Sequence, residues 1–180
     1  VFYVRADSPY KTIEDLKGKN LGLVDPNSTS GNNVPRFILH KMKIVPEKYF
    51  AHVTYTGSHE NAVIALQQKT VDVSADWWKS DDDSNLMRMV KKGMAKKDDF
   101  RIILKSDLIP NSPNAYLADL PADMKTAIRK AFEDAPTKDK TAFDRLSDGK
   151  DRGFKPVDAK YYEPVIELIE FIDSLRKQKS

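Results

Sequence analysis

The chain has 180 residues, of which 40% are hydrophobic and 32% are charged, a composition typical of a globular protein rather than a disordered one. The 30 Lys and Arg residues nearly balance the 27 Asp and Glu residues, and the net charge of +3 does not by itself indicate nucleic-acid binding. The absence of cysteine excludes disulfides, thiolate metal ligands and cysteine nucleophiles. No apolar run reaches the roughly 18 residues of a membrane span, and no signal peptide is visible.

Along residues 1–105, short apolar runs alternate with amphipathic runs, which predicts strands alternating with helices. Residues 1–5 predict a strand that is already under way, so we expect earlier residues to be absent from this chain. Thr12 is predicted to cap a short helix that ends at Gly18. Further strands are predicted at 20–24, 52–55, 71–75 and 101–104, with helices at 35–42, 60–68 and 85–93 between them. This order predicts βαβ units and a mainly parallel sheet.

The pattern changes after Lys105, where a connection with two prolines leads into a mainly helical region. Helices are predicted at 121–135, 137–146 and 161–177, and the last has one apolar face at spacings of three and four residues. The members of this face are Val165, Leu168, Ile169, Ile172 and Leu175. We therefore predict an α/β lobe at 1–105 and a helical part at 106–180 that packs on something other than this lobe.

Two segments place small hydroxyl residues where a predicted strand turns into a predicted helix. The segment 25–31 (DPNSTSG) follows one strand, and the segment 57–60 (GSHE) follows the next. The start of a helix leaves backbone N–H groups unpaired and carries a partial positive charge, so it favours an anion. Two such starts aimed at one point predict a site for a tetrahedral oxyanion of the phosphate type.

The side chains of the two turns add donors of their own. Ser28, Thr29 and Ser30 supply hydroxyls. Gly31 lets a ligand approach the backbone, and His59 supplies a ring nitrogen whose charge responds to an anion. Hydroxyl residues before a helix are also ordinary N-caps, so each turn alone has a purely structural interpretation. Three consecutive hydroxyls followed by glycine exceed what one cap needs, and the second similar turn favours a ligand site.

Asp76, Trp77 and Trp78 follow the strand predicted at 71–75, at the carboxyl edge of the sheet, where open α/β folds bind ligands. One interpretation is that a tryptophan lines the ligand pocket or faces a ligand cation, and that Asp76 pairs with this cation. The other interpretation is that both tryptophans are packing or interface aromatics.

Motifs for catalysis and cofactors are missing from the sequence. It has no G-x-S-x-G elbow, P-loop or G-x-G-x-x-G fingerprint, and its three histidines do not have zinc spacing. The segment 147–150 (SDGK) fits S-x-x-K, but the companion sequences of that motif are absent. The acidic run 81–83 lacks the glycine and glutamate of a calcium loop, and we expect it to favour the start of the next helix. The sequence thus predicts no enzyme activity, no cofactor and no metal site.

Several segments together resemble the phosphonate-binding proteins of bacterial ABC transporters. The main ones are 8–19 (SPYKTIEDLKGK), 25–31 (DPNSTSG) and 57–60 (GSHE), with 71–73 (VDV) and 108–113 (LIPNSP) following in the family's order. The segments 75–80 (ADWWKS) and 147–153 (SDGKDRG) are similar to the rhizobial branch. The resemblance covers nearly the whole chain.

The resemblance implies a type II periplasmic binding protein, in which two lobes close over a solute that is then delivered to a membrane ABC permease. It implies that Ser28, Thr29, Ser30 and His59 bind the oxygens of a phosphonate or a related phosphorus oxyanion. It also implies a periplasmic location, and neither nucleic acid nor an obligate homo-oligomer is expected.

The same resemblance divides the chain. Residues 1–5 and 102–105 would be the crossover strands, and residues 8–100 would form the second lobe. The region from Ser106 would complete the first lobe, whose N-terminal half this chain does not contain.

The sequence departs from members that bind aminoethylphosphonate, which hold the ammonium group with two carboxylates. One of these positions is Ser112 here, and the other is Lys79 by simple alignment. Asp76, with Trp77 or Trp78 stacked on the cation, would be the substitute, so the identity of the ligand's organic half stays open.

Two other functions stay open on the sequence. A ligand-sensing domain of a transcription regulator for a small anion shares this fold, and it would need a helix-turn-helix before Val1. A phosphate-ester enzyme would need a metal cluster or a nucleophile–base pair, which the chain does not offer.

Overall fold

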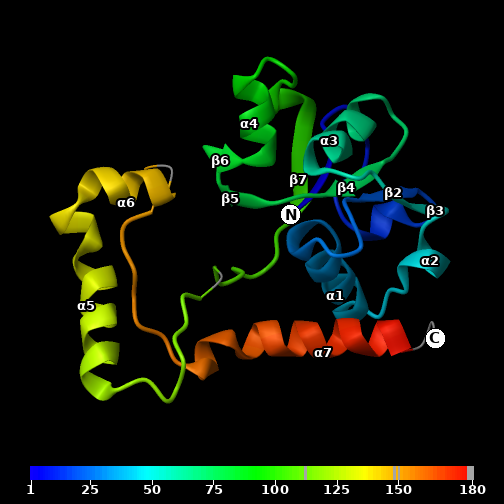
Figure 1. The fold of residues 1–180 in the computed structure, drawn as a ribbon. Coiled ribbons are helices and arrows are strands. Elements are labelled where there is room, and N and C mark those ends of the chain that lie inside the picture. The colour runs from blue at the N-terminus through cyan, green and yellow to red at the C-terminus, as the bar shows by residue number, and fades with distance from the viewer. Residues whose placement is uncertain (112, 148, 150, 178–180) are drawn as a thin grey trace. The chain divides into compact units, whose positions relative to one another are not determined.

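The computed structural model describes residues 1–111, 113–147, 149 and 151–177. The chain forms two compact units, of which the first is Val1–Ile109 with the residues from Ile166 onward and the second is Pro110–Val165. The sheet and the two strand-to-helix turns lie in the first unit (Figure 1). Residues 166–177 thus belong to the same unit as the sheet, whereas the division predicted from the sequence ends this lobe at residue 105.

The sheet of the first unit has five strands in the order β3-β2-β4-β1-β7. They are β1 (Phe2–Arg5), β2 (Asn20–Leu23), β3 (His52–Tyr55), β4 (Val73–Ala75) and β7 (Phe100–Leu104). β2 runs parallel to both of its neighbours, β3 and β4, whereas β1 lies antiparallel between β4 and β7. The α/β class is therefore confirmed, whereas the sheet is mixed rather than mainly parallel, because β1 makes antiparallel pairings on both of its sides.

Helices cover both faces of this sheet, with α1 (Val34–Lys41) and α2 (Pro46–Tyr49) on one face and α3 (His59–Gln67) and α4 (Asn85–Lys91) on the other (Figure 1). Each face of the sheet has its own apolar core, and β1 contributes to both, because successive residues of a strand point to opposite faces. Phe2 belongs to the cluster that contains Leu39 of α1, whereas Tyr3 belongs to the cluster that contains Val63 of α3 and Met89 of α4.

Short elements complete the first unit. The helix predicted after Thr12 is a single 3₁₀ turn, η1 (Glu14–Leu16), and the Asp15 carboxylate accepts hydrogen bonds from the N–H groups of Lys11 and Thr12 at 2.8 and 3.0 Å. These two bonds lower the pKa of Asp15. A second 3₁₀ turn, η3 (Lys97–Asp99), precedes β7.

A small hairpin, β5 (Trp78–Ser80) with β6 (Asp83–Ser84), was not predicted. The acidic run 81–83 was predicted to favour the start of the next helix, and it does precede α4, but it does not form the cap. Asp83 belongs to β6, and Ser84 rather than an aspartate caps α4 by accepting a hydrogen bond from the Met87 N–H.

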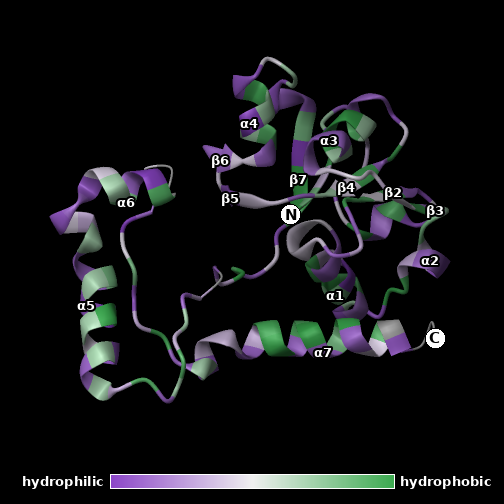
Figure 2. Cartoon of the chain, in the orientation of Figure 1, coloured by the Kyte–Doolittle hydropathy of each residue, from purple (hydrophilic) through white to green (hydrophobic). Residues whose placement is uncertain are grey.

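The last helix, α7 (Glu163–Lys177), packs on α1 through an aromatic cluster. The Phe171 ring lies 5.4 Å from the Phe37 ring and 4.6 Å from the His40 ring, measured between centroids. Leu168 and Ile172 are buried on the same side. Hydrophobic residues recur along α7 (Figure 2), and two of them, Ile166 and Ile169, remain exposed.

The second unit contains α5 (Ala122–Lys138), α6 (Lys140–Ser147) and the 3₁₀ turn η4 (Ala159–Tyr162). Its small core joins Phe154 to Phe132 and Phe143, with ring centroids 4.9 and 5.8 Å apart. In neither unit, over the residues described, does a helix combine the length and the apolar character needed to cross a membrane.

Candidate functional site

The first strand-to-helix turn follows β2 and contains a π-helical turn, η2 (Thr29–Asn33), that runs directly into α1. Ser28 caps it, because its Oγ accepts a hydrogen bond from the Gly31 N–H at 3.1 Å. The Ser28 carbonyl accepts two more, from the N–H groups of Asn32 and Asn33. Turns of this wide kind are frequent at functional sites.

Gly31 is required here by close packing. A Cβ at this position would lie 2.5 Å from the Cβ of Val24 and 2.9 Å from the Oγ of Ser28. No side chain fits at such distances, so only glycine lets η2 sit directly on the end of β2.

The second turn follows β3 and opens α3. Gly57 has a φ of +85°, which favours glycine, and Ser58 caps the helix by accepting a hydrogen bond from the Asn61 N–H at 3.1 Å. Helix α3 begins at His59, one residue before the predicted start.

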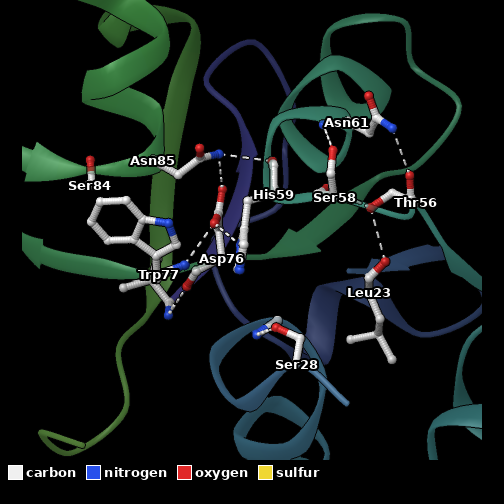
Figure 3. Close-up of polar contacts among 12 residues, drawn as sticks. Leu23, Ser28, Thr56, Ser58, His59, Asn61, Asp76, Trp77, Ser84 and Asn85 are labelled. Atoms are coloured by element: carbon white, nitrogen blue, oxygen red, sulfur yellow. Dashed lines mark hydrogen bonds and ion pairs between the residues drawn. The ribbon is translucent and has the colours of Figure 1, made fainter. Parts of the chain in front are cut away.

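Hydrogen bonds tie the two turns together. The Val24 carbonyl accepts a hydrogen bond from the Gly57 N–H at 2.8 Å, while the Val24 N–H donates to the Gly31 carbonyl at 3.0 Å. The Thr56 hydroxyl donates to the Leu23 carbonyl at 3.1 Å. Because β2 and β3 are parallel neighbours, both helix starts lie at the same edge of the sheet (Figure 3).

This edge presents hydrogen-bond donors without acceptors. Within the described ranges, the hydroxyls of Thr29 and Ser30 make no hydrogen bond, and the N–H groups of Thr29, Ser30, His59 and Glu60 find no acceptor. Thr29 is exposed, and Ser28 and Ser30 are half-buried. Unpaired donors at two adjoining helix starts are the arrangement that holds a multiply charged anion.

His59 is held by a buried carboxylate. Its Nδ1 lies 2.5 Å from Oδ1 of Asp76, which follows β4, the other neighbour of β2. The Asp76 side chain has no exposed surface, and it also accepts hydrogen bonds from the Trp77 N–H at 2.8 Å and from Asn85 Nδ2 at 2.7 Å (Figure 3). The His59 side chain keeps 28% of its surface exposed.

Each tryptophan carries a cation of the chain itself on its ring. The Arg88 guanidinium lies 4.7 Å from the centre of the Trp77 ring, and Lys105 Nζ lies 3.5 Å from that of Trp78. Trp78 also lines a cavity of about 280 Å³ with Tyr3, Ser84 and Lys105, among others. Burial raises the pKa of Tyr3 to about 12. Any ligand cation at these rings would meet the two basic side chains.

A buried network lies beneath the first turn. Arg36 of α1 donates to Asn32 Oδ1 at 2.9 Å, to Glu47 Oε1 at 2.7 Å and to the Tyr55 hydroxyl at 3.3 Å. Burial alone lowers the pKa of Arg36, but the hydrogen bonds and negative charge of its partners outweigh it, so the pKa is raised. Arg36 is therefore a permanent positive charge under η2.

The structure brings Ser28, Thr29, Ser30 and His59 to one edge of the sheet, with Asp76 buried behind His59. Ser112 lies outside the described residues, as do positions 148 and 150 of the SDGK segment. Among the residues described, no three His, Asp or Glu side chains gather to hold a metal ion.

Sequence reasoning missed Asn32, Arg36 and Asn85, all of them buried. The only signal for Asn85 was its position after Ser84 at a helix start, which predicts an exposed cap residue. Nothing in the sequence indicates that Asn32 and Arg36, one helical turn apart, point inward.

Comparison with known proteins agrees with this architecture. The family model for the phosphonate ABC transporter periplasmic substrate-binding protein matches residues 1–162. The phosphonates-binding periplasmic protein of Escherichia coli K12 is 30% identical over 136 residues, which are 73% of this chain and 38% of that protein.

Two solved structures share the fold. A binding protein component of a phosphonate ABC transporter from Pseudomonas aeruginosa has a TM-score of 0.68 at 26% identity, with 96% of this chain and 57% of that chain covered. The periplasmic aliphatic sulphonate binding protein of E. coli has a TM-score of 0.63 at 19% identity, with 98% and 60% covered. The chain thus spans between about two fifths and three fifths of these relatives, and its type II periplasmic binding protein fold is confirmed. With its two joined helix starts and a family match over residues 1–162, this chain belongs to the family of phosphonate ABC transporter periplasmic substrate-binding proteins.

Proposed function

We propose that this protein is the periplasmic solute-binding component of an ABC importer for phosphonates or related phosphorus oxyanions, and that it is not an enzyme. The observation that carries the proposal is the pair of helix starts joined through Val24, in a chain of the phosphonate-binding family. The alternative of a ligand-sensing domain in a transcription regulator gains no support from any comparison.

In this proposal the three oxygens of the phosphonate group meet three kinds of donor. The hydroxyls of Ser28, Thr29 and Ser30 and the free N–H groups of η2 approach from one turn. His59 and the first N–H groups of α3 approach from the other. Hydrogen bonds to a charged group are each worth about 1.5–3 kcal/mol, so a few of them suffice for tight capture.

The organic half of the ligand would lie beside Trp77 and Trp78. Asp76 is a less suitable partner for a ligand cation, because its buried carboxylate already accepts three hydrogen bonds. The Arg88 and Lys105 cations over the two rings further disfavour an ammonium group, so we propose that compounds without a cation are preferred.

The larger assembly follows from the family. We propose that β1 and β7, which pair side by side, are the crossover strands, and that the sheet of the first unit belongs to the lobe that carries the anion site. A second lobe would close over the ligand, and the closed form would be recognised by a membrane permease.

The test is calorimetry on the full-length protein with methylphosphonate, aminoethylphosphonate, phosphite and phosphate. We expect tight binding of at least one phosphorus oxyanion, and a loss of about 10- to 100-fold in affinity for Thr29→Ala and for His59→Ala.

Thr70→Ala is the matched control, because it removes a hydroxyl at the far end of α3, where Thr70 Oγ1 donates to the Ala65 carbonyl. Unchanged affinity in both site variants would contradict the residue assignment. Absence of binding for all four anions would contradict the proposed function.

A further inference from the structure

Asp76 accepts hydrogen bonds on both of its carboxyl oxygens. Asn85 Nδ2 donates to the His59 carbonyl at 2.9 Å, and because a carbonyl only accepts, the Asn85 atom at this position is the NH₂ group. The same NH₂ group lies 2.7 Å from Asp76 Oδ2, while the Trp77 N–H donates to Oδ1. Both carboxyl oxygens therefore accept hydrogen bonds, and from this pattern we infer that Asp76 is a carboxylate here.

The tautomer of His59 follows from this inference. Its Nδ1 lies 2.5 Å from Asp76 Oδ1, and opposite a carboxylate oxygen we assign the proton of this contact to Nδ1. The second ring nitrogen, Nε2, makes no hydrogen bond with any residue that the structure describes. This nitrogen is left either with a lone pair, in the neutral ring, or with a second proton, in the imidazolium ring.

The other groups at this edge of the sheet do not have this choice. The N–H groups of Thr29, Ser30 and Glu60 only donate, and the hydroxyls of Thr29 and Ser30 both donate and accept but keep the same charge near neutral pH. Nε2 is thus the one position of the described site that takes a proton from a ligand or gives one to it.

We propose that the His59–Asp76 pair makes this site selective for tetrahedral oxyanions that can carry a proton, such as phosphonates, phosphite and phosphate, over sulfonates of the same shape. This inference rests on the proposed function, because it assumes that the anion binds at the two joined turns. Asp76 acts as a positioning residue, and His59 acts as the residue that senses the ligand's proton.

The proton inventory explains the selectivity. The second ionisation of a phosphoryl-type group lies in the region of neutral pH (about 6 for a phosphorylated side chain), so such a group exchanges there between a P–O–H form and a dianion. The P–O–H form donates its proton to the lone pair of Nε2, and the dianion accepts a proton from Nε2–H of the imidazolium ring. The two pairs contain the same single proton and differ only in which atom holds it.

A sulfonate has no such proton. Against the neutral ring its oxygen would face the Nε2 lone pair, and it would bind only after the ring took a proton from the solvent. It also brings one negative charge where a phosphonate brings up to two, so its bonds to the same donors are weaker. The fold is shared with a sulphonate-binding protein, so the selectivity must come from side chains at the site.

The experiment compares methylphosphonate with methanesulfonate, which have the same shape, by calorimetry on the full-length protein at one pH near neutral. We expect methylphosphonate to bind at least about 10- to 100-fold more tightly, and we expect His59→Gln and Asp76→Asn to reduce this ratio by about tenfold or more. Glu167→Gln is the matched control, because it neutralises an exposed carboxylate of α7 that pairs with Lys41 and takes no part in the two turns. It should leave the ratio unchanged.

A spectroscopic readout separates positioning from folding. In protein labelled with ¹⁵N at histidine, the His59 signals, assigned from their absence in His59→Gln, should report a protonated Nδ1. They should also show a shift of Nε2 when methylphosphonate binds, and Asp76→Asn should change the Nδ1 signal in the free protein.

The outcomes are distinct. Equal affinity for both anions in the unmodified protein, or an Nδ1 without a proton, would overturn this inference and leave the proposed function standing. Binding of neither anion would overturn both. If Asp76→Asn does not fold, a phosphonate-to-sulfonate ratio that is unchanged in His59→Gln would still contradict the inference.

Discussion

Four buried polar side chains lie around the two strand-to-helix turns. Asn32 and Arg36 lie under η2, and Asp76 and Asn85 lie behind His59. Burying a polar group is unfavourable unless it is hydrogen-bonded, and these four side chains have partners. Their placement at one edge of the sheet indicates that these buried hydrogen bonds fix the positions of the two turns and of His59.

Tyr3 gives a prediction about pH at the scale of a single residue. Burial raises its pKa to about 12, whereas a tyrosine in an unfolded chain ionises near 10. The folded state therefore keeps the proton longer, so the stability that Tyr3 contributes is fully present below pH 10 and is lost as pH rises towards about 12. A difference of about two pKa units between the folded and unfolded states corresponds to about 2–3 kcal/mol in the free energy of unfolding.

The measurement is the free energy of unfolding in urea between pH 8 and pH 12. We expect Tyr3→Phe to flatten the loss of stability above pH 10 relative to the unmodified chain. Tyr116→Phe, at an exposed tyrosine, should keep the original slope. Identical slopes for Tyr3→Phe and the unmodified chain would contradict the burial argument.

At the scale of elements, the contact between η2 and the end of β2 depends on Gly31. Gly31→Ala would place a methyl group 2.5 Å from the Val24 Cβ, so the turn must move away from the strand. We expect a loss of about 1–3 kcal/mol in the free energy of unfolding and at least a tenfold loss in anion affinity. Urea unfolding and calorimetry measure the two effects.

Gly18→Ala is the informative control. Gly18 has a φ of +73°, and a methyl group added there would meet only open space, so alanine should destabilise by about 1–2 kcal/mol through backbone strain alone. Its anion affinity should not change. Equal loss of affinity in both variants would mean that general destabilisation, rather than the η2 contact, weakens binding.

The sequence predicts the main elements well, because each is marked by a local pattern. The strands at 20–24 and 52–55 and the helix at 85–93 are confirmed to within two residues at either end. The antiparallel insertion of β1 could not be predicted, because the pairing of Phe2 with Ala75 joins residues that no local pattern connects. The β5–β6 hairpin was missed because its strands are too short to show an alternation.

For the candidate site, the two turns were predicted from their strand–glycine–hydroxyl–helix order. The environment of Asp76 was not, because a carboxylate after a strand has the same sequence signature whether it faces a ligand or is buried. Asp76 is buried because three donors surround its carboxylate, including Asn85 on α4. Only the three-dimensional fold brings these donors together.

At the scale of the whole chain, stability is distributed unevenly between the two units. The buried apolar residues lie almost entirely in the first unit, and among the described residues of the second unit Phe143 is the one buried hydrophobic side chain. Local opening is easiest where few apolar contacts are buried. The amides of α5 should therefore exchange with solvent far more readily than those of β2 and β4.

Hydrogen exchange on the 180-residue chain tests this difference. We expect α5 amides to exchange at least about 100-fold faster than those of β2, which corresponds to an opening free energy lower by about 3 kcal/mol. The α7 amides next to Leu168 and Ile172 should be intermediate, because this helix buries one face on α1. Equal protection of α5 and β2 would mean that the second unit is stabilised by contacts beyond its own aromatic core, whereas fast exchange of α7 would contradict its packing on α1.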